Sequence, residues 1–100
     1  PAQFNLLPNY PNPFNPTTAI LFDLPRPARV DLTVYSMDGK SIKSLENGNL
    51  PSGRHQRVWN GTDQNGIRVA SGIYFYRLQA TSIDNRAPLY FCTKKMALTK

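Results

Sequence analysis

Short apolar runs separated by proline and glycine constrain the fold of this chain more than any other feature. The 100 residues include nine prolines and six glycines, and apolar residues seldom recur at the spacing of a helix. Apolar and polar residues instead alternate with a period of two, which is the pattern of half-buried β-strands. In TTAILFDL, residues 17–24, this alternation places Ile20, Phe22 and Leu24 on one face. The pattern predicts an all-β domain.

The next segment, ARVDLTVY at residues 28–35, alternates in the same way. Val30, Leu32 and Val34 are expected to face inward, with polar residues between them. A short, rigid Pro-Arg-Pro link joins this segment to the one before it. We therefore expect the two segments to be neighbouring antiparallel strands.

Turn signals separate the strands that follow. Asp38-Gly39 predicts a tight turn, because glycine adopts positive φ without a steric penalty. SIKSL then returns as a short strand, and the Asn, Gly and Pro of residues 46–55 predict a loop. Strand-like HQRVWN follows, with Trp59 predicted to fill the core.

The last two strands are the most apolar. IYFYRLQAT, residues 73–81, is apolar on both faces and predicts a central strand covered on both sides. PLYFCTKKMALT, residues 88–99, predicts the closing strand, with a bulge or kink at Lys94-Lys95. The lone Cys92, which follows the apolar Tyr90 and Phe91, is interpreted as a small core residue. About seven short strands at near-regular spacing are typical of an antiparallel β-sandwich, which strand number and length favour over a barrel.

An Asn/Pro stretch, NYPNPFNP, precedes the first of these strands. Proline fixes its own φ and restricts the residue before it, so the stretch is stiff. Tyr10 and Phe14 are expected to dock on the sandwich, which divides the chain into a lead-in at 1–16 and a sandwich at 17–100. A plain semi-rigid linker is the alternative. Because the chain begins at Pro1, we expect it to be a piece of a longer polypeptide.

The charge distribution argues against nucleic acid as a partner. Twelve Lys and Arg against six Asp and Glu give a net charge of +6, but the cations are spread evenly and form no stripe. No apolar run approaches the length that crosses a bilayer. The lysines near the C-terminus are too few for stable attachment to a membrane.

Residues for catalysis or metal binding do not form a recognisable set. His55 lies beside a glycine turn, and no nucleophile motif accompanies it, so we expect no enzyme activity and no catalytic residue. In NGTDQNG, Asp63 and Asn65 offer oxygen ligands. One carboxylate is a poor calcium site, and both residue types favour turns. The sequence predicts no metal site and no cofactor.

A series of motifs along nearly the whole chain resembles one family. The motifs are NYPNPFNPTT, VYSMDGK, LPSGRHQRVWNGTDQNG, VASGIYFYRLQA and KKMALTK. From about residue 7 to residue 100 they are similar to the type A sorting domains of the type IX secretion system, C-terminal bacterial modules that overlap the immunoglobulin-like domain of the flagellar hook-capping protein. One departure is Arg57, because the family usually has an apolar residue two positions after the histidine.

The resemblance implies a fold, a location and partners. It implies an immunoglobulin-like sandwich that sorts a secreted or cell-surface protein through the periplasm and outer membrane of a Gram-negative bacterium. The implied partners are the outer-membrane secretion machinery and an upstream catalytic or adhesive domain of the same chain. Further positions that match the family are Val34, Tyr35, Tyr74 and Leu78. The candidate recognition residues are Pro11, Asn12, Pro13, Asp38, Gly39, Lys40, Gly53, Gly72, Lys94 and Lys95.

Two other noncatalytic functions stay open. The domain can be a structural spacer between a catalytic module and the cell surface. It can also be a carbohydrate-binding accessory module of an extracellular enzyme, because exposed aromatic rings form platforms for sugars. The candidate rings are Trp59, Tyr35, Tyr74, Tyr76 and Tyr90. The alternation around Tyr74 and Tyr76 instead favours a place in the core for those two.

Overall fold

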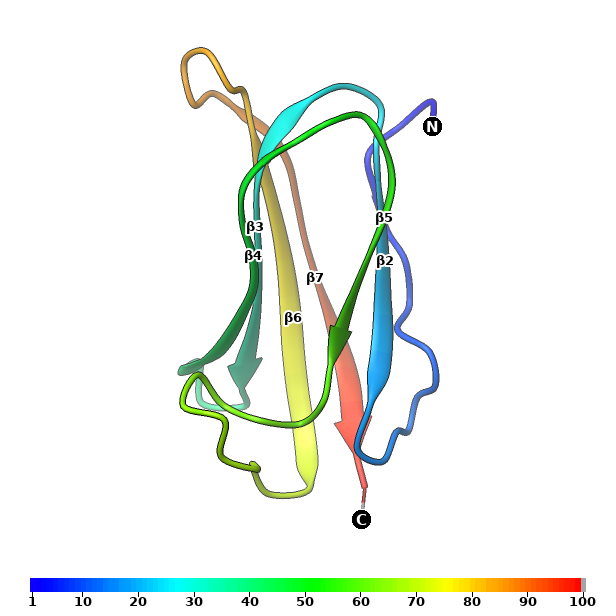
Figure 1. Cartoon of the computed structure of the whole chain (residues 1–100), viewed down its shortest axis with the longest axis vertical. Coiled ribbons are helices and arrows are strands. Elements are labelled where there is room, and N and C mark those ends of the chain that lie inside the picture. The colour runs from blue at the N-terminus through cyan, green and yellow to red at the C-terminus, as the bar shows by residue number, and fades with distance from the viewer. Residues whose placement is uncertain (100) are drawn as a thin grey trace.

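The computed structural model describes residues 1–99 and places seven strands in two packed sheets (Figure 1). No helix occurs among these residues. The strands are β1 (Asn5–Leu6), β2 (Thr18–Leu24), β3 (Ala28–Ser36), β4 (Ser41–Leu50), β5 (Gly53–Trp59), β6 (Gly72–Thr81) and β7 (Pro88–Leu98). The predicted immunoglobulin-like antiparallel β-sandwich is confirmed.

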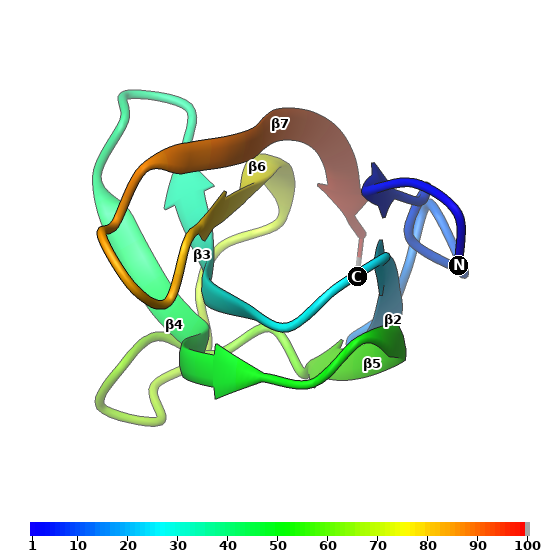
Figure 2. The ribbon, with the colours of Figure 1, turned by 90° about the horizontal axis from the view of Figure 1, so that it is seen from above.

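The smaller sheet has the order β1-β2-β5 and the larger sheet the order β4-β3-β6-β7. All strand pairs are antiparallel. Figure 2 shows the two sheets from above, with β2 and β5 facing the curved larger sheet. The domain is elongated, at 41 × 22 × 20 Å.

The expectation that residues 17–24 and 28–35 pair with each other is wrong. Strand β2 pairs with β1 and β5, whereas β3 pairs with β4 and β6. Both strands bury one apolar face in the same core, but from opposite sheets. Pro25 and Pro27 have no N–H to donate to a hairpin ladder, and the link between β2 and β3 carries the chain across the core instead.

The core lies between the sheets and confirms the predicted inward faces. Ile20, Phe22 and Leu24 of β2 are fully buried, and so are the three inward residues of β3, Val30, Leu32 and Val34. Trp59 also fills the core as predicted: its ring packs against Phe14 and Tyr74, with centroids 5.7 and 5.2 Å away. Its indole Nε1 donates a hydrogen bond to the carbonyl of Thr62 at 2.8 Å.

Residues 46–55 are mostly strand, not loop. Strand β4 continues to Leu50, and β5 begins at Gly53. Polar and glycine residues are tolerated here because β4 is an edge strand of the larger sheet. Its pairing with β3 is regular from Glu46 to Leu50, and the two register shifts fall outside this stretch, at Leu45 and Ile42.

Strand β6 is central, as expected, but it is covered on one face only. Tyr74, Tyr76 and Leu78 are buried in the core, while Phe75 and Arg77 lie half-buried on the outer face. Neighbouring side chains of the same sheet shield those outer residues, so no second layer is needed. The apolar pattern therefore overestimated the coverage of this strand.

The expected bulge at Lys94-Lys95 is wrong as well. The pairing of β6 with β7 is unbroken there, with Tyr76 opposite Lys94 and Phe75 opposite Lys95, and shifts only between Ala80 and Thr81. Lys94 shares the inward face of β7, where a long aliphatic stem can lie along apolar neighbours. Also on this face, Cys92 is half-buried and packs against the core.

The lead-in at 1–16 packs along the smaller sheet. Asn5 pairs with Asp23 and Leu6 with Phe22, so β1 extends that sheet. Phe14 is buried in the core as expected, but Tyr10 is 80% exposed. The backbone of Tyr10 exchanges two hydrogen bonds with that of Ala19, which leaves its ring in solvent.

Candidate recognition surface

Most of the candidate recognition residues gather at one end of the sandwich. We call it the C-terminal end, since β7 finishes there; β3 also finishes there, and β2 and β6 begin there, at the bottom of Figure 1. Gly53 lies at the other end, opposite Leu24, and Lys94 and Lys95 lie along β7. The candidates at the C-terminal end are exposed: Pro11, Asn12, Pro13, Asp38, Gly39, Lys40 and Gly72.

The Asn/Pro motif fastens the lead-in to the final strand. The side-chain Oδ1 of Asn12 accepts a hydrogen bond from the backbone N–H of Ala97 at 3.0 Å. The N–H of Phe14 donates to the carbonyl of Ala97 at 3.0 Å, and the N–H of Thr99 donates to the carbonyl of Phe14 at 2.9 Å. The motif thus forms a short continuation of the larger sheet beside the end of β7.

A buried polar pair, missed at the sequence level, holds the same motif from its other side. Asn9 Nδ2 donates to Thr18 Oγ1 at 3.0 Å, and Thr18 Oγ1 donates to the carbonyl of Pro11 at 2.8 Å. Both side chains are buried. Their partners lie across the bend between lead-in and β2, so spacing in the sequence carries no signal for this contact.

The β3–β4 turn has the predicted conformation. Gly39 has φ of 85°, and its N–H donates to the carbonyl of Ser36 at 3.0 Å. The N–H of Ser36 donates to the carbonyl of Lys40 at 2.9 Å. A hydrogen bond from the Ser36 hydroxyl lowers the pKa of Asp38, which therefore presents a carboxylate to solvent.

Gly61 is a further residue at this end that sequence reasoning missed. It is buried, its φ is 76°, and a Cβ there would lie 3.2 Å from the carbonyl oxygen of Pro16. The side chain of Leu98 lies just beyond it. The lead-in, the loop after β5 and the end of β7 meet at this position, where only glycine fits without strain.

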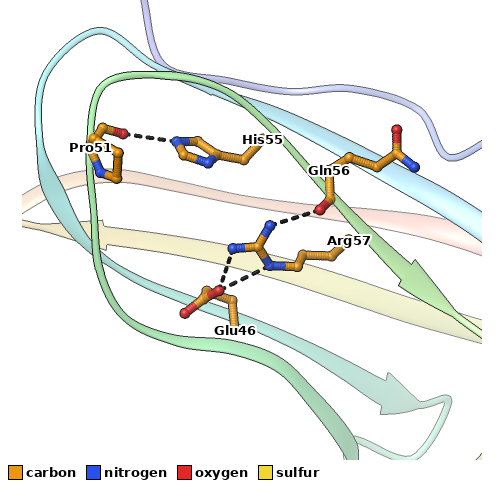
Figure 3. Close-up of polar contacts among 5 residues, drawn as sticks. All are labelled: Glu46, Pro51, His55, Gln56 and Arg57. Carbon is orange, nitrogen blue, oxygen red and sulfur yellow. Dashed lines mark hydrogen bonds and ion pairs between the residues drawn. The ribbon is translucent and has the colours of Figure 1, made fainter.

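The open side of the sandwich where β4 faces β5 is closed by an ion pair (Figure 3). Arg57 Nε, from β5, donates to Glu46 Oε1, from β4, at 2.9 Å, and its Nη1 donates to the carbonyl of Gln56 at 2.7 Å. The guanidinium lies 6.0 Å from the ring centre of Phe22. Arginine stands at the expected apolar position because it covers this ring and pairs with Glu46.

His55 lies beside this ion pair but is engaged differently. Its Nε2 lies 2.8 Å from the carbonyl oxygen of Pro51, and its ring stacks on Phe22 with centroids 5.4 Å apart. The structure gives it neither a carboxylate nor a hydroxyl partner among residues 1–99. The ring packs at the rim of the core.

The aromatic residues that were candidates for a sugar platform are not brought together. Trp59, Tyr74 and Tyr76 are buried, and burial raises the pKa of the Tyr76 hydroxyl to about 12. That hydroxyl donates to the carbonyl of Leu7 at 2.9 Å. Tyr90 stacks on Phe4, with ring centres 5.7 Å apart.

The remaining candidate, Tyr35, belongs to a cluster on the outer face of the larger sheet. The Arg77 guanidinium lies 4.5 Å from the ring centre of Tyr35 and 5.6 Å from that of Phe91. It also donates a hydrogen bond to the Tyr35 hydroxyl. Tyr35 and Phe91 are therefore each engaged by a cation of their own sheet.

Neither a metal-ligand cluster nor a membrane-spanning helix occurs in the described part of the chain. Residues 1–99 contain no cluster of three or more His, Cys, Asp or Glu able to hold a metal ion. Asp63 Oδ1 accepts the backbone N–H groups of Asn65 and Ile67, at 2.9 and 3.0 Å, which assigns it to a turn. None of these residues forms a helix able to cross a membrane. Lys100, the last residue of KKMALTK, lies outside the described residues.

Comparison with solved structures supports the fold. The chain superposes on PorU of Porphyromonas gingivalis, solved as a latent dimer, with a TM-score of 0.75 and 20% identity. It also superposes on PorZ of the same organism, described as an essential bacterial surface component of the type-IX secretion system, with a TM-score of 0.57 and 19% identity. Each comparison covers 96% of this chain, but 9% of PorU and 12% of PorZ.

Sequence comparison identifies the family. The basal-body rod modification proteins FlgD of Salmonella typhimurium and Salmonella typhi are each 33% identical to this chain over 67 residues. The match covers 66% of this chain and 29% of each FlgD protein. A family model for the FlgD Ig-like domain matches residues 11–84. The chain therefore belongs to the FlgD Ig-like domain family.

Proposed function

We propose that this domain is a noncatalytic C-terminal sorting module of a secreted or cell-surface bacterial protein, recognised in its folded state by the type IX secretion machinery. One observation carries the proposal. The motif residues of the lead-in and of the β3–β4 turn are far apart in sequence but lie, exposed, at the C-terminal end. A partner can recognise that combination only when the sandwich is folded.

The comparisons support a general link to secretion, which is broader than the specific sorting role. PorZ is a type IX component, and both PorU and PorZ contain a region of this fold that makes up a small share of their length. This chain likewise matches only 29% of FlgD. These proportions favour a module attached to a larger cargo, which travels through the periplasm and outer membrane to the surface or the medium.

The pairing of β1 with β2 and the hydrogen bonds from Asn12 and Phe14 to the end of β7 fix the path of the lead-in along the sandwich. A cargo domain upstream of residue 1 would be held close to the β1 side of the sandwich. The lead-in would then keep the C-terminal end clear for the machinery, because residue 1 lies at the other end of the molecule (Figure 1).

A fusion experiment tests the proposal. A folded reporter that carries an export signal is fused to this chain and produced in a bacterium with a type IX system. We expect the reporter on the surface or in the medium, and in the periplasm when residues 88–100 are deleted. The intact fusion in a strain without the system is the control. Secretion of the truncated fusion would contradict a sorting role for the final strand.

A structural spacer is the second candidate, because a domain of this family also occurs in the rod modification protein FlgD, so membership of the family alone does not imply sorting. A spacer needs only a stable sandwich. If this chain is a spacer, a fusion in which an unrelated sandwich of similar size replaces it should still be secreted. The sorting proposal requires that the replacement leave the reporter in the periplasm. A carbohydrate-binding role has less support, because Trp59, Tyr74 and Tyr76 are buried.

A further inference from the structure

The two edge strands of the larger sheet differ in how well they are protected. The β4 edge is irregular: its register with β3 shifts twice, and the N–H of Ser44 donates to the side chain of Gln64 at 3.1 Å. The β7 edge is regular, because its pairing with β6 runs without a shift from Leu98 back to Tyr90. Regular edges accept a further strand more readily than bulged and covered ones.

The hydrogen bonds of Ala97 define which backbone groups of β7 face this edge. Its N–H donates to Asn12 and its carbonyl accepts from Phe14, so both groups point away from β6. Backbone groups alternate in direction along a strand. The N–H and C=O groups of Lys95, Thr93 and Phe91 therefore point the same way. Among residues 1–99 no strand pairs with this stretch, which we call the β7 edge.

The side chains beside the β7 edge carry apolar area and positive charge. Phe91 is 61% exposed, Lys95 is exposed, and Arg77 lies against Phe91 on the same face of the sheet. On the same face, but over β3, β4 and β6 and away from the β7 edge, Arg29 and Arg86 line a hollow of about 360 Å³. Its other lining residues include one acid, Asp31, with Asn47, Gln79 and Thr81.

This charge disfavours pairing with a second copy of the chain and favours an acidic partner. Two copies paired through their β7 edges would bring the exposed Lys95 side chains of both copies to the shared edge, in a chain of net charge +6. Acidic side chains on an added strand would instead lie beside Lys95, with Arg77 one strand further in, on β6. Beside the end of β7, the lead-in already extends the larger sheet through the parallel bridge of Phe14 to Leu98. An added strand would extend the sheet in the same way beside residues 91–95.

We propose that the β7 edge binds an extended segment of an acidic partner protein, which adds a strand to the larger sheet. Backbone hydrogen bonds to Phe91, Thr93 and Lys95 would supply affinity, and the Lys95 side chain would select acidic side chains. This inference does not depend on which larger protein carries the domain. It concerns a different surface from the turn at the C-terminal end.

A peptide titration tests the inference on the 100-residue chain. The probe is a short peptide of alternating Glu and Thr, and its counterpart has Lys in place of Glu. Amide hydrogen exchange is followed by NMR. We expect the Glu peptide to slow exchange at Phe91, Thr93 and Lys95 and to leave Cys92 and Lys94, already bonded to β6, unchanged.

Matched variants distinguish the contribution of the Thr93 backbone N–H to binding from that of its side chain. Thr93→Pro removes one outward N–H, and we expect it to weaken binding about tenfold, the effect of one lost hydrogen bond. Thr93→Val keeps the N–H and should bind like the unmodified chain. If the proline variant unfolds in a thermal melt, Lys95→Glu decides: it should weaken binding of the Glu peptide and strengthen that of the Lys peptide.

Three results would overturn the inference. The Glu peptide gives no protection at the alternate amides, or both peptides bind equally, or Thr93→Val weakens binding as much as Thr93→Pro. In the first case the lysines of β7 act only to guard an exposed edge against aggregation, a common role for charges at such positions.

Discussion

The side chain of Asn12 accepts a hydrogen bond from the backbone of Ala97, which lies 85 residues later in the chain. This contact joins the Asn/Pro motif of the lead-in to the final strand. Together with the bonds between Phe14 and residues 97 and 99, it makes the two ends of the chain one structural unit. Residues that look like an N-terminal motif and a C-terminal motif therefore form one surface.

Removing this acceptor should destabilise the domain. Asn12→Ala leaves the N–H of Ala97 to bond with water, since the site is exposed, so we expect a loss of about 0.5–1 kcal/mol in the free energy of unfolding. The measurement is urea denaturation. Asn15→Ala, at an exposed position of the same motif, is the matched control and should cost less. Equal losses would mean that the bond to Ala97 contributes nothing.

Gly61 tests the close approach beneath the lead-in. Gly61→Ala combines a strained positive φ with a Cβ 3.2 Å from the carbonyl of Pro16, and we expect a loss of about 2–3 kcal/mol. Gly66→Ala is the control, because its φ is 80° and nothing lies within 4 Å of its Cβ position. It should lose only about 1 kcal/mol. If thermal denaturation gives the same loss for both, the contact with Pro16 is not tight.

A double-mutant cycle tests the ion pair between the sheets. Arg57→Leu alone leaves the half-buried Glu46 without its partner, and we expect a loss of about 1–2 kcal/mol in unfolding free energy. Adding Glu46→Leu should recover most of it, because apolar residues can also cover Phe22. Chemical denaturation of the four proteins gives the coupling. Additive losses would show that Glu46 and Arg57 act independently.

Asp23 should make stability depend on pH in the acid range. Both of its oxygens accept hydrogen bonds from Arg54, at 2.7 and 3.0 Å, and these bonds lower the pKa of Asp23. A lowered pKa in the folded state stabilises the domain above the unfolded value of about 3.9, and this contribution is lost as the pH falls through the folded value. Urea denaturation across this range should show a shallower pH dependence for Asp23→Asn than for the unmodified chain. If the unfolding free energies of Asp23→Asn and of the unmodified chain depend on pH equally, Asp23 is not the group responsible.

The core could be predicted from the sequence because alternation is a local property. Ile20, Phe22 and Leu24 face inward, as their spacing indicates. The sheet to which each strand belongs could not be predicted in this way. The same alternation is found in two strands that form a hairpin and in two strands that lie in opposite sheets. The turn at Gly39 was predictable for the same local reason.

The rest of the surface depends on contacts between distant residues. Gly61 reads as one more turn glycine until Pro16 and Leu98 are placed against it. Arg57 reads as a departure from the family until Glu46 is seen to pair with it. Such residues have ordinary local patterns, and only the packing of the two sheets makes them specific.

The most direct test of recognition through the folded C-terminal end compares two hairpin turns in the secretion assay. Asp38→Ala/Lys40→Ala alters the β3–β4 turn, and Asp84→Ala/Arg86→Ala makes a matched change in the β6–β7 turn at the other end; all four residues are exposed. Thermal melts first verify that both variants fold. We expect the first variant to leave the reporter in the periplasm and the second to secrete it normally. Equal secretion of the two would contradict recognition at the C-terminal end.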